Sequence, residues 1–218
     1  MNNHIVILFD LDGVIIDTEP QYDLFWRKMG EDYHLGIKEF EKKVKGLILP
    51  DIIQRFFSHL PEKDQQIIKQ GSDTNELQME IIPIAGVLDF IRSLKQAGFP
   101  LGLVTSSGAA KLAMVLEKLH LQSCFDTIVS SDRITKGKPD PMCFQTAAND
   151  LDVLPEQCIV FEDSFHGIAA GNAAGMKVIG LSTTNSREDI QDSVIHVMPD
   201  FQSFGVDDLL KLLSSTCP

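Results

Sequence analysis

The chain has 218 residues, of which 44% are hydrophobic and 23% charged, proportions that are ordinary for a globular protein with one large core or a core that carries an insertion. No apolar run approaches the ~20 residues of a membrane helix, and no basic segment with an apolar core follows Met1, so we expect neither a membrane anchor nor a secretory signal. The formal net charge of −12 argues against a nucleic-acid partner but leaves small anionic substrates open, because a bound cation can reverse the local field.

The first predicted element is a strand at residues 4–9 that runs directly into two carboxylates. Its unbroken apolar run, with β-branched residues, suits a strand buried on both faces. Asp10 and Asp12 follow on the same side of the chain, and Gly13 allows a tight turn. On this stretch alone two readings stay open, namely a divalent cation that reconciles the two like charges, or an Asx-rich turn that ends a strand.

The next segment, from residue 19 to about residue 82, contains no convincing strand and has helical spacing. Pro20 suits a first helical turn, and the acidic residues after Pro61 have the sign that is favoured at a helix start. The segment holds the only Trp and both Tyr of the chain, and the simplest interpretation of its aromatic residues is the core of a small helical bundle. We assign residues 18–83 to an inserted helical cap, joined by linkers near 14–18 and 82–86.

From Pro83 onward, strand-like apolar runs alternate with amphipathic helical patterns. This alternation implies right-handed crossovers and a parallel sheet. The predicted fold class is α/β, a doubly wound parallel sheet of the Rossmann type, with residues 1–17 and 84–218 as the core. We expect strands at residues 100–104, 125–129, 158–161, 177–180 and 194–198, and helices near residues 86–97, 112–119, 141–151, 169–174 and 206–213.

Polar residues follow several of these strands, at the edge where open α/β sheets bind ligands. They are Asp10 and Asp12 after the first strand, Thr105 and Ser106 after the second, Lys136 and Lys138 in the loop after the third, and Glu162 and Asp163 after the fourth. Such a set suits phosphoryl transfer, because a carboxylate can attack phosphorus while cationic and N–H donors hold the phosphoryl oxygens. Oxygen ligands such as Asp10 and Asp163 favour Mg²⁺ over Zn²⁺.

Four short motifs, in this order, resemble those of the haloacid dehalogenase superfamily. They are Asp10-Leu11-Asp12-Gly13-Val14, Val104-Thr105-Ser106, Lys138-Pro139 and Glu162-Asp163-Ser164-x-x-Gly167, and the match covers nearly the whole chain. The stretch Asp17-Thr18-Glu19-Pro20 and the helical block after it resemble the branch of β-phosphoglucomutase-like enzymes and sugar-phosphate phosphatases with a small helical cap.

The resemblance implies catalytic roles for three residues. Asp10 is expected to be the nucleophile that becomes phosphorylated. Asp12 is expected to protonate the leaving oxygen and then to activate water. Lys138 is expected to neutralise the nucleophile and the phosphoryl group. An aspartate at position 12 implies phosphate-ester chemistry, because the dehalogenating members of the superfamily lack this second acid.

The resemblance also implies two binding sites. Thr105 and Ser106, together with Lys138, are expected to bind the phosphate. Asp10, the backbone carbonyl of Asp12, and Asp163 are expected to be Mg²⁺ ligands. Glu162 is expected to hold the ion directly or through water.

Three candidate substrate-contacting residues lie in the helical block, namely Glu19, Tyr22 and Lys45. For Glu19 the alternative is charge stabilisation of a helix N-terminus, and for Lys45 it is a solvated lysine at a helix end. Tyr22 stands where the mutase branch has a histidine, and Leu49 stands where that branch has an arginine. Both departures weaken the interpretation as a mutase.

We therefore expect a Mg²⁺-dependent phosphatase that hydrolyses a small phosphorylated metabolite, a sugar or polyol phosphate, through an aspartyl-phosphate. The alternatives are a phosphosugar mutase of the β-phosphoglucomutase type and a non-catalytic module that binds a phosphometabolite. The scattered cysteines, without a C-x-x-C pair, are interpreted as reduced and structural rather than as a metal-thiolate site. We expect a cytoplasmic monomer without nucleic-acid or membrane partners.

Overall fold

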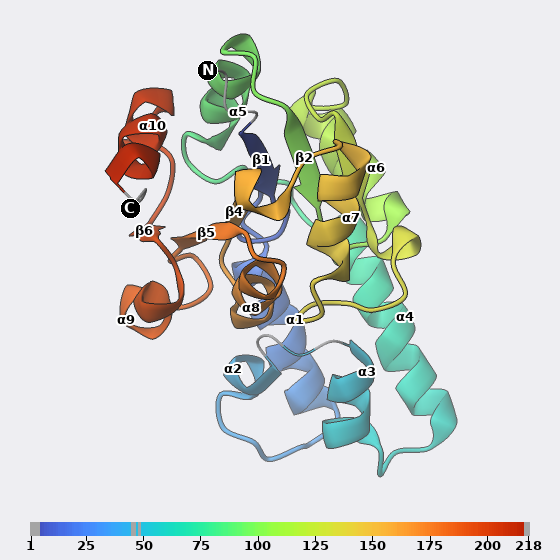
Figure 1. Ribbon diagram of the computed structural model, residues 1–218. Helices are drawn as coiled ribbons and strands as arrows, with labels where there is room; N and C mark the ends of the chain where they lie inside the picture. Colours follow the sequence, from blue (N-terminus) through green and yellow to red (C-terminus); the bar gives the residue numbers. More distant parts are fainter. Residues whose placement is uncertain (1–4, 45–46, 48, 216–218) are drawn as a thin grey trace. The chain divides into compact units, whose positions relative to one another are not determined.

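The structure is a computed structural model that describes residues 5–44, 47 and 49–215 (Figure 1). It divides into two compact units, an α/β unit of Met1–Asp17 with Ile81–Pro218 and a helical unit of Thr18–Glu80. Residues 81–83, which the sequence assigned to the helical block, belong to the α/β unit. The reason is a pair of backbone hydrogen bonds, in which Asp17 N donates to Ile82 O (2.8 Å) and Ile84 N donates to Ile15 O (2.9 Å).

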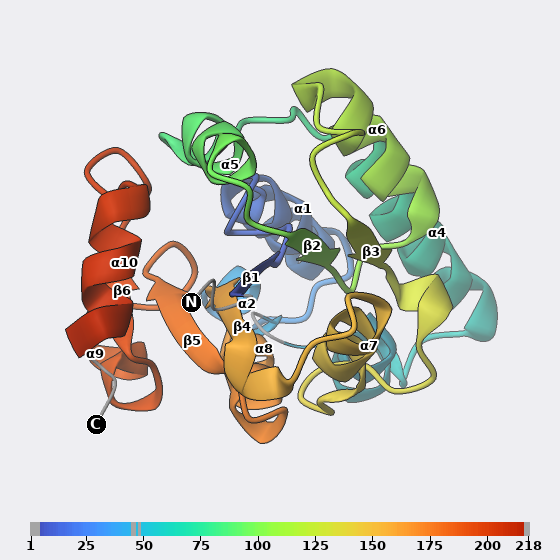
Figure 2. The same ribbon diagram turned by 45° about the horizontal axis from the view of Figure 1, so that its top comes forward.

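The α/β unit is built on a six-stranded sheet. Its strands are β1 (Val6–Phe9), β2 (Leu101–Val104), β3 (Thr127–Val129), β4 (Cys158–Glu162), β5 (Lys177–Leu181) and β6 (His196–Met198). All neighbouring pairs are parallel, and the order across the sheet is β3-β2-β1-β4-β5-β6 (Figure 2). In the central strand β1, Ile7 is opposite Leu101 of β2 on one side and Ile159 of β4 on the other. The predicted doubly wound α/β class is confirmed.

Helices follow the strands in alternation and cover both faces of the sheet. They are α5 (Val87–Gln96), α6 (Ala109–Leu119), α7 (Met142–Asp150), α8 (Phe165–Ala173), α9 (Arg187–Ile190) and α10 (Val206–Ser215), with short 3₁₀ turns η2 (Ser131–Arg133), η3 (Pro155–Gln157) and η4 (Gln191–Ser193). α5, α6 and α10 pack on one face, and α7, α8 and α9 on the other (Figure 2). α8 begins ahead of the Ala-rich run that predicted it, because Ser164 Oγ caps it by accepting the N–H of Gly167 (3.0 Å).

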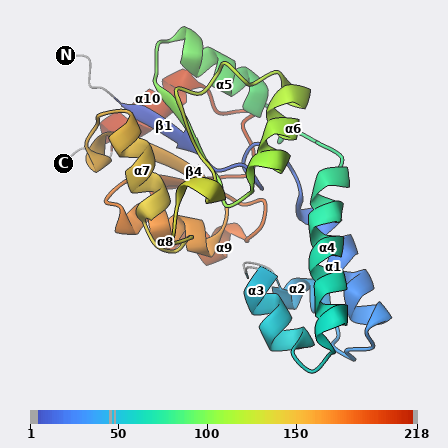
Figure 3. The ribbon, with the colours of Figure 1, turned by 90° about the vertical axis from the view of Figure 1, so that its right-hand side faces the viewer.

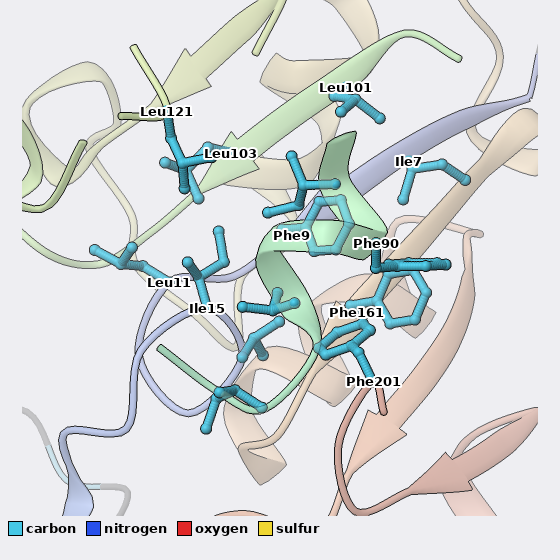
Figure 4. Packing of buried hydrophobic residues seen from close by; sticks show 14 of the residues in the cluster. Ile7, Phe9, Leu11, Ile15, Phe90, Leu101, Leu103, Leu121, Phe161 and Phe201 are labelled. Carbon is cyan, nitrogen blue, oxygen red and sulfur yellow. The ribbon is translucent and has the colours of Figure 1, made fainter. Parts of the chain in front are cut away.

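The residues of β1 alternate between two separate apolar cores. Ile7 and Phe9 join the core beneath α5, α6 and α10, whereas Val6 and Leu8 join the core on the opposite face. Phe9 stacks on Phe161 of β4 with ring centroids 5.1 Å apart, and Phe90 and Phe201 surround this pair (Figure 4). The strand is therefore buried on both faces, as its apolar run predicted, and its carboxyl end is held in place by packing.

The helical unit has a core of its own. Its elements are α1 (Glu19–Asp32), α2 (Phe40–Val44), α3 (Leu49–Ile52), a π-helical turn η1 (Ile53–Phe57) and α4 (Glu62–Gln78). Trp26, Phe40 and Phe57 pack together in edge-to-face geometry, as the bundle-core interpretation predicted. α1 and α4 lie side by side (Figure 3), and Tyr22 Oη donates to Glu76 Oε1 between them (2.7 Å).

Within the described ranges, none of the helices combines the length and the apolar character that a bilayer-spanning segment needs.

Candidate active site

The carboxyl ends of three adjacent strands bring the sequence-predicted residues of the α/β unit to one edge. β1 lies between β2 and β4, so Asp10, Thr105 and Asp163 follow neighbouring strands. Two backbone hydrogen bonds continue the ladder beyond the strand ends, because Asp10 N donates to Phe161 O (3.0 Å) and Thr105 N donates to Val129 O (2.8 Å). The backbone pairing of the sheet therefore extends to Asp10 and Thr105 at this edge.

Lys138 joins two carboxylates at this edge. Its Nζ lies 2.6 Å from Asp10 Oδ1 and 2.6 Å from Glu162 Oε1, and it also donates to Val104 O (3.4 Å). The side chains of Lys138, Asp10 and Glu162 are 7%, 10% and 1% exposed. The ring of Phe144 lies below the ammonium at 5.1 Å, in cation–π geometry. We call Lys138, Asp10 and Glu162 the Lys138 cluster.

Burial dominates the electrostatics of this cluster. Desolvation, which Lys138 only partly offsets and which the nearby carboxylates of Glu162 and Asp12 reinforce, raises the pKa of Asp10 to about 7. Desolvation acts to lower the pKa of Lys138, but the carboxylates of Asp10 and Glu162 outweigh it and hold that pKa well above its usual value. Lys138 therefore stays protonated, and the cluster carries surplus negative charge when Asp10 is ionised.

Glu162 is held by both of its carboxylate oxygens. Oε1 accepts from Lys138, and Oε2 accepts from the backbone N–H groups of Asp163 and Ser164 (both 2.8 Å) and from Ser164 Oγ (3.0 Å). Gly167 makes room for it, because a Cβ there would lie 1.6 Å from Glu162 Oε1. The last residue of β4 is thus locked between Lys138 and the first turn of α8.

Asp12 belongs to a second group of charges. Lys111 Nζ lies 2.6 Å from Asp12 Oδ1, and Ser107 Oγ donates to Asp12 Oδ2 (2.8 Å). The side chain of Lys111 is 2% exposed and that of Asp12 is 29% exposed. Asp10 and Asp12, which leave the same strand end, are therefore each paired with a different lysine.

The loop after β5 forms hydrogen bonds with Asp163 and Gly13 at this edge. Thr184 Oγ1 donates to Asp163 Oδ2, and Asn185 Nδ2 donates to Asp163 O (2.9 Å). Thr183 Oγ1 donates to Gly13 O (2.6 Å). Gly13 has a φ of +74°, and a Cβ there would lie 1.9 Å from Asp163 Oδ2. Glycine at this position thus allows the positive φ of the turn and leaves space for the carboxylate of Asp163.

The oxygen donors at this edge fit a divalent cation. Asp10, Glu162 and Asp163, all buried, each offer a carboxylate oxygen within 4.8 Å of the others. Lys138 supplies one positive charge beside these three carboxylates, and it contacts Asp10 and Glu162. Hard oxygen donors are the ligands that Mg²⁺ and Ca²⁺ prefer. A cation among these oxygens would bring the group closer to neutrality.

The remaining predicted residues have varied surroundings. Thr105 is buried, and its hydroxyl accepts the N–H of Ser107 (3.0 Å), whereas Ser106 is exposed. Glu19 begins α1, and Tyr22 lies on α1 with its hydroxyl bound to Glu76. Lys45 lies outside the described residues.

The sequence analysis did not predict five residues of this edge, namely Lys111, Ser107, Thr183, Thr184 and Asn185. For the lysine and for the three loop residues the sequence nevertheless carries a signal. Lys111 is four positions before Val115 on the buried face of α6, where a charged residue is unusual. The loop residues follow the fifth strand, so the rule that selected residues at the other strand ends selects them too.

Comparisons with known proteins agree with this geometry. A sequence model described as haloacid dehalogenase-like hydrolase matches residues 7–181. Over 187 residues the chain is 30% identical to a phosphorylated carbohydrates phosphatase of Thermotoga maritima, covering 79% of this chain and 82% of that protein. It is likewise 30% identical over 187 residues to a β-phosphoglucomutase of Bacillus subtilis, covering 80% and 82%. A crystal structure of a HAD hydrolase, family IA, variant 3, from Entamoeba histolytica shares the fold, with a TM-score of 0.83 at 22% identity over 96% of this chain and 99% of that chain.

Proposed function

This chain belongs to the haloacid dehalogenase-like hydrolase family, and on that premise we propose that it hydrolyses a small phosphorylated metabolite, a sugar or polyol phosphate, with Mg²⁺ as its cation and through an aspartyl-phosphate. The family and its phosphatase relatives make the chain a phosphoric monoester hydrolase. The observation that carries the proposal is the buried Lys138 cluster beside Asp163, with the second carboxylate of Asp12 close by. The carbohydrate phosphatase relative supports the proposed substrate class.

The proposed reaction has two halves that share Asp10 and Asp12. In the first half, a carboxylate oxygen of Asp10 attacks phosphorus, the bond from phosphorus to the ester oxygen breaks, and Asp12 gives a proton to the leaving oxygen. In the second half, Asp12 takes a proton from water as the water oxygen attacks the phosphorus, and the bond to Asp10 breaks. The sum is one ester and one water giving one alcohol and one phosphate.

Other residues of the edge prepare the phosphoryl group and its cation. Lys138 would hold Asp10 in place and pair with the phosphoryl oxygens, and Thr105 and Ser106 would bind them at the start of α6. The ligands for the cation would be Asp10, Asp163 and the backbone carbonyl of Asp12, with Glu162 binding directly or through water. Bound Mg²⁺ would supply positive charge that stabilises the charge on the phosphoryl oxygens.

A phosphosugar mutase is the second candidate, because a β-phosphoglucomutase is as similar to this chain as the carbohydrate phosphatase is. A mutase must keep a doubly phosphorylated intermediate and turn it around. The chain has Tyr22 and Leu49 where the mutase branch has histidine and arginine, which favours the phosphatase. An isomerised sugar phosphate that forms without net phosphate release would support the mutase instead.

The helical unit is proposed to act as the cap that selects the substrate. Glu19 and Tyr22 keep their proposed part in this selection, as does Lys45. Glu19→Gln and Tyr22→Phe are expected to change the ranking of substrates in a panel more than they change turnover of p-nitrophenyl phosphate, which offers no sugar to recognise.

Phosphate release from a panel of sugar and polyol phosphates, with and without Mg²⁺, tests the proposed function. We expect turnover of at least one member with Mg²⁺, and its loss in EDTA. Asp10→Asn should abolish turnover, and the matched control is Asp89→Asn, which alters an aspartate whose side chain is 89% exposed. Activity that survives Asp10→Asn or persists in EDTA would contradict the mechanism, and a panel without any turnover would contradict the function.

A further inference from the structure

We propose that Lys111 and Ser107 form a clamp that positions the carboxylate of Asp12 for proton transfer to the leaving group. We call these two residues the Asp12 clamp. The inference rests on the proposed function, because it takes Asp12 as the group that protonates the leaving oxygen. It assigns a purpose to a buried lysine that the family motifs quoted above do not include.

The clamp holds Asp12 at two points. Lys111 Nζ lies 2.6 Å from Oδ1, and Ser107 Oγ donates to Oδ2 at 2.8 Å. A single bond would let the carboxylate swing about its contact, whereas two bonds fix the plane of the carboxylate. Both partners come from the start of α6 and the turn before it, which is far along the chain from Asp12.

The three side chains are buried to different extents, which indicates different roles. Lys111 and Ser107 are 2% and 8% exposed, whereas the side chain of Asp12 is 29% exposed. The ammonium of Lys111 is thus almost fully withdrawn from water, and such a charge is retained where a partner compensates it. Asp12 therefore presents the accessible surface of this group, and Lys111 is a positioning residue rather than a contact of the substrate.

The two bonds of the clamp differ in how easily they release. Asp12 must free one oxygen to reach the leaving group. The hydroxyl of Ser107 is neutral and turns about one single bond, whereas the bond to Lys111 is assisted by charge on both sides. The carboxylate of Asp12 therefore loses its hydrogen bond from Ser107 and rotates while its bond to Lys111 remains. Since Ser107 directly follows the proposed phosphate-binding residues Thr105 and Ser106, occupation of that turn by phosphate can trigger the release.

The acid step can be isolated by comparing two substrates in kcat/KM, which reports events up to departure of the leaving group. The pair is the best sugar or polyol phosphate of the panel and p-nitrophenyl phosphate, whose leaving group departs without a proton. Asp12→Asn gives the reference pattern. For Lys111→Met we expect kcat/KM to fall about 100-fold for the sugar or polyol ester and less than about threefold for the aryl ester.

Two further variants complete the comparison. Lys118→Met alters an exposed lysine of the same helix and should leave both substrates unchanged. Lys111→Arg keeps the charge and should recover part of the loss on the sugar or polyol ester. If Lys111→Met does not fold, as judged by its thermal unfolding, Ser107→Ala is measured instead, with the same selectivity at smaller size.

Equal losses on both substrates, for Lys111→Met or for Ser107→Ala, would overturn the clamp, because they would mean a general effect on the fold or on phosphate binding. A selective loss in Asp12→Asn that is absent in folded Lys111→Met would also overturn it. A wild-type enzyme that cleaves neither ester would instead contradict the proposed function, so the two failures are distinct.

Discussion

Two lysines meet carboxylates at the same edge of the sheet and at the same distance, yet their surroundings differ. Lys138 binds two carboxylates, Asp10 and Glu162, whose side chains are 10% and 1% exposed. Lys111 binds Asp12, whose side chain is 29% exposed. All three contacts measure 2.6 Å.

Distance alone therefore does not define what an ion pair does. In the Lys138 cluster every charge is buried, and removal of one partner leaves the others uncompensated in a medium that solvates them poorly. In the Asp12 clamp the carboxylate keeps access to water, so it can change partners at small cost. The first arrangement suits a fixed nucleophile, and the second suits a group that must move a proton.

The largest effect is expected from Lys138→Met, which removes the lysine of the Lys138 cluster, the more deeply buried of the two arrangements. Without added divalent cation, two buried carboxylates lose their shared lysine, and the free energy of unfolding should fall by about 3–5 kcal/mol. With Mg²⁺, kcat should fall about 10³-fold. Denaturant unfolding and steady-state kinetics measure the two effects. Lys136→Met is the control, since its side chain is 66% exposed. A stability equal to wild type would show that the cluster is less dependent on Lys138 than its burial indicates.

A smaller effect is expected from Thr184→Val, which keeps the shape of the side chain but removes the hydroxyl that donates to Asp163. The carboxylate loses its orientation, so the affinity for Mg²⁺ should fall about 10–100-fold. Titration calorimetry measures this without reference to activity. Thr74→Val, in the helical unit, is the control, because the hydroxyl of Thr74 donates to Gln70 O within α4 (2.7 Å). An unchanged Mg²⁺ affinity would argue against Asp163 as a ligand or against Thr184 as its support.

Asp132→Ala tests the helix that carries the Asp12 clamp. Asp132 Oδ2 accepts the N–H of Ala109 in the first turn of α6 (3.0 Å), two residues before Lys111. Loss of this cap should lower the free energy of unfolding by about 1 kcal/mol. Asp132→Asn retains an acceptor and should lose less. Equal losses in the two variants, measured by denaturant unfolding, would mean that the charge rather than the cap matters.

The smallest effect is expected at a partly exposed ion pair outside the Lys138 cluster and the Asp12 clamp. Arg133 binds Asp150 through two nitrogens, at 2.7 and 3.0 Å, and lowers the pKa of Asp150. Because the pKa is lower in the folded state, the stabilisation is present above the unfolded pKa of about 3.9 and is lost as pH falls through the folded value.

Asp150→Asn should therefore cost at most about 1 kcal/mol near neutral pH, after allowance for solvent screening of the partly exposed pair. Unfolding measured between neutral pH and about pH 2 should show the gap between wild type and variant closing as the pH falls. A gap that widens in acid would reverse the assigned sign.

The sequence predicted the sheet well because its strands are continuous apolar runs and its ligand edge follows from topology. Asp10, Thr105 and Asp163 could be selected from their places after strands before any contact was known. The boundaries were less predictable. The strand expected from Phe125 begins at Thr127, and the carboxylate of Asp126, just before it, accepts the N–H of Leu101 (2.8 Å). Residues 81–83 joined the α/β unit through backbone bonds that leave no mark in composition.

The sequence pattern could not predict which lysine pairs with which aspartate. A cation was inferred to reconcile Asp10 with Asp12, but the structure also gives each aspartate its own lysine. Lys138 was selected through its motif, whereas Lys111 stands within an amphipathic helical pattern whose buried face is otherwise apolar. Periodicity places a residue on a face, yet which carboxylate it meets depends on side-chain packing between segments distant along the chain.

The space beside two glycines has a consequence for experiment. At Gly13 and at Gly167, the volume that a methyl group would fill is already occupied by the carboxylates of Asp163 and Glu162. Alanine at Gly167 would push Glu162 aside while leaving every charge of the edge in the chain. Such a steric substitution asks where a charge must stand, whereas substitution of the acid itself asks only whether the charge must exist. Comparing the two kinds of variant would separate the effect of the position of the Glu162 carboxylate from the effect of its charge.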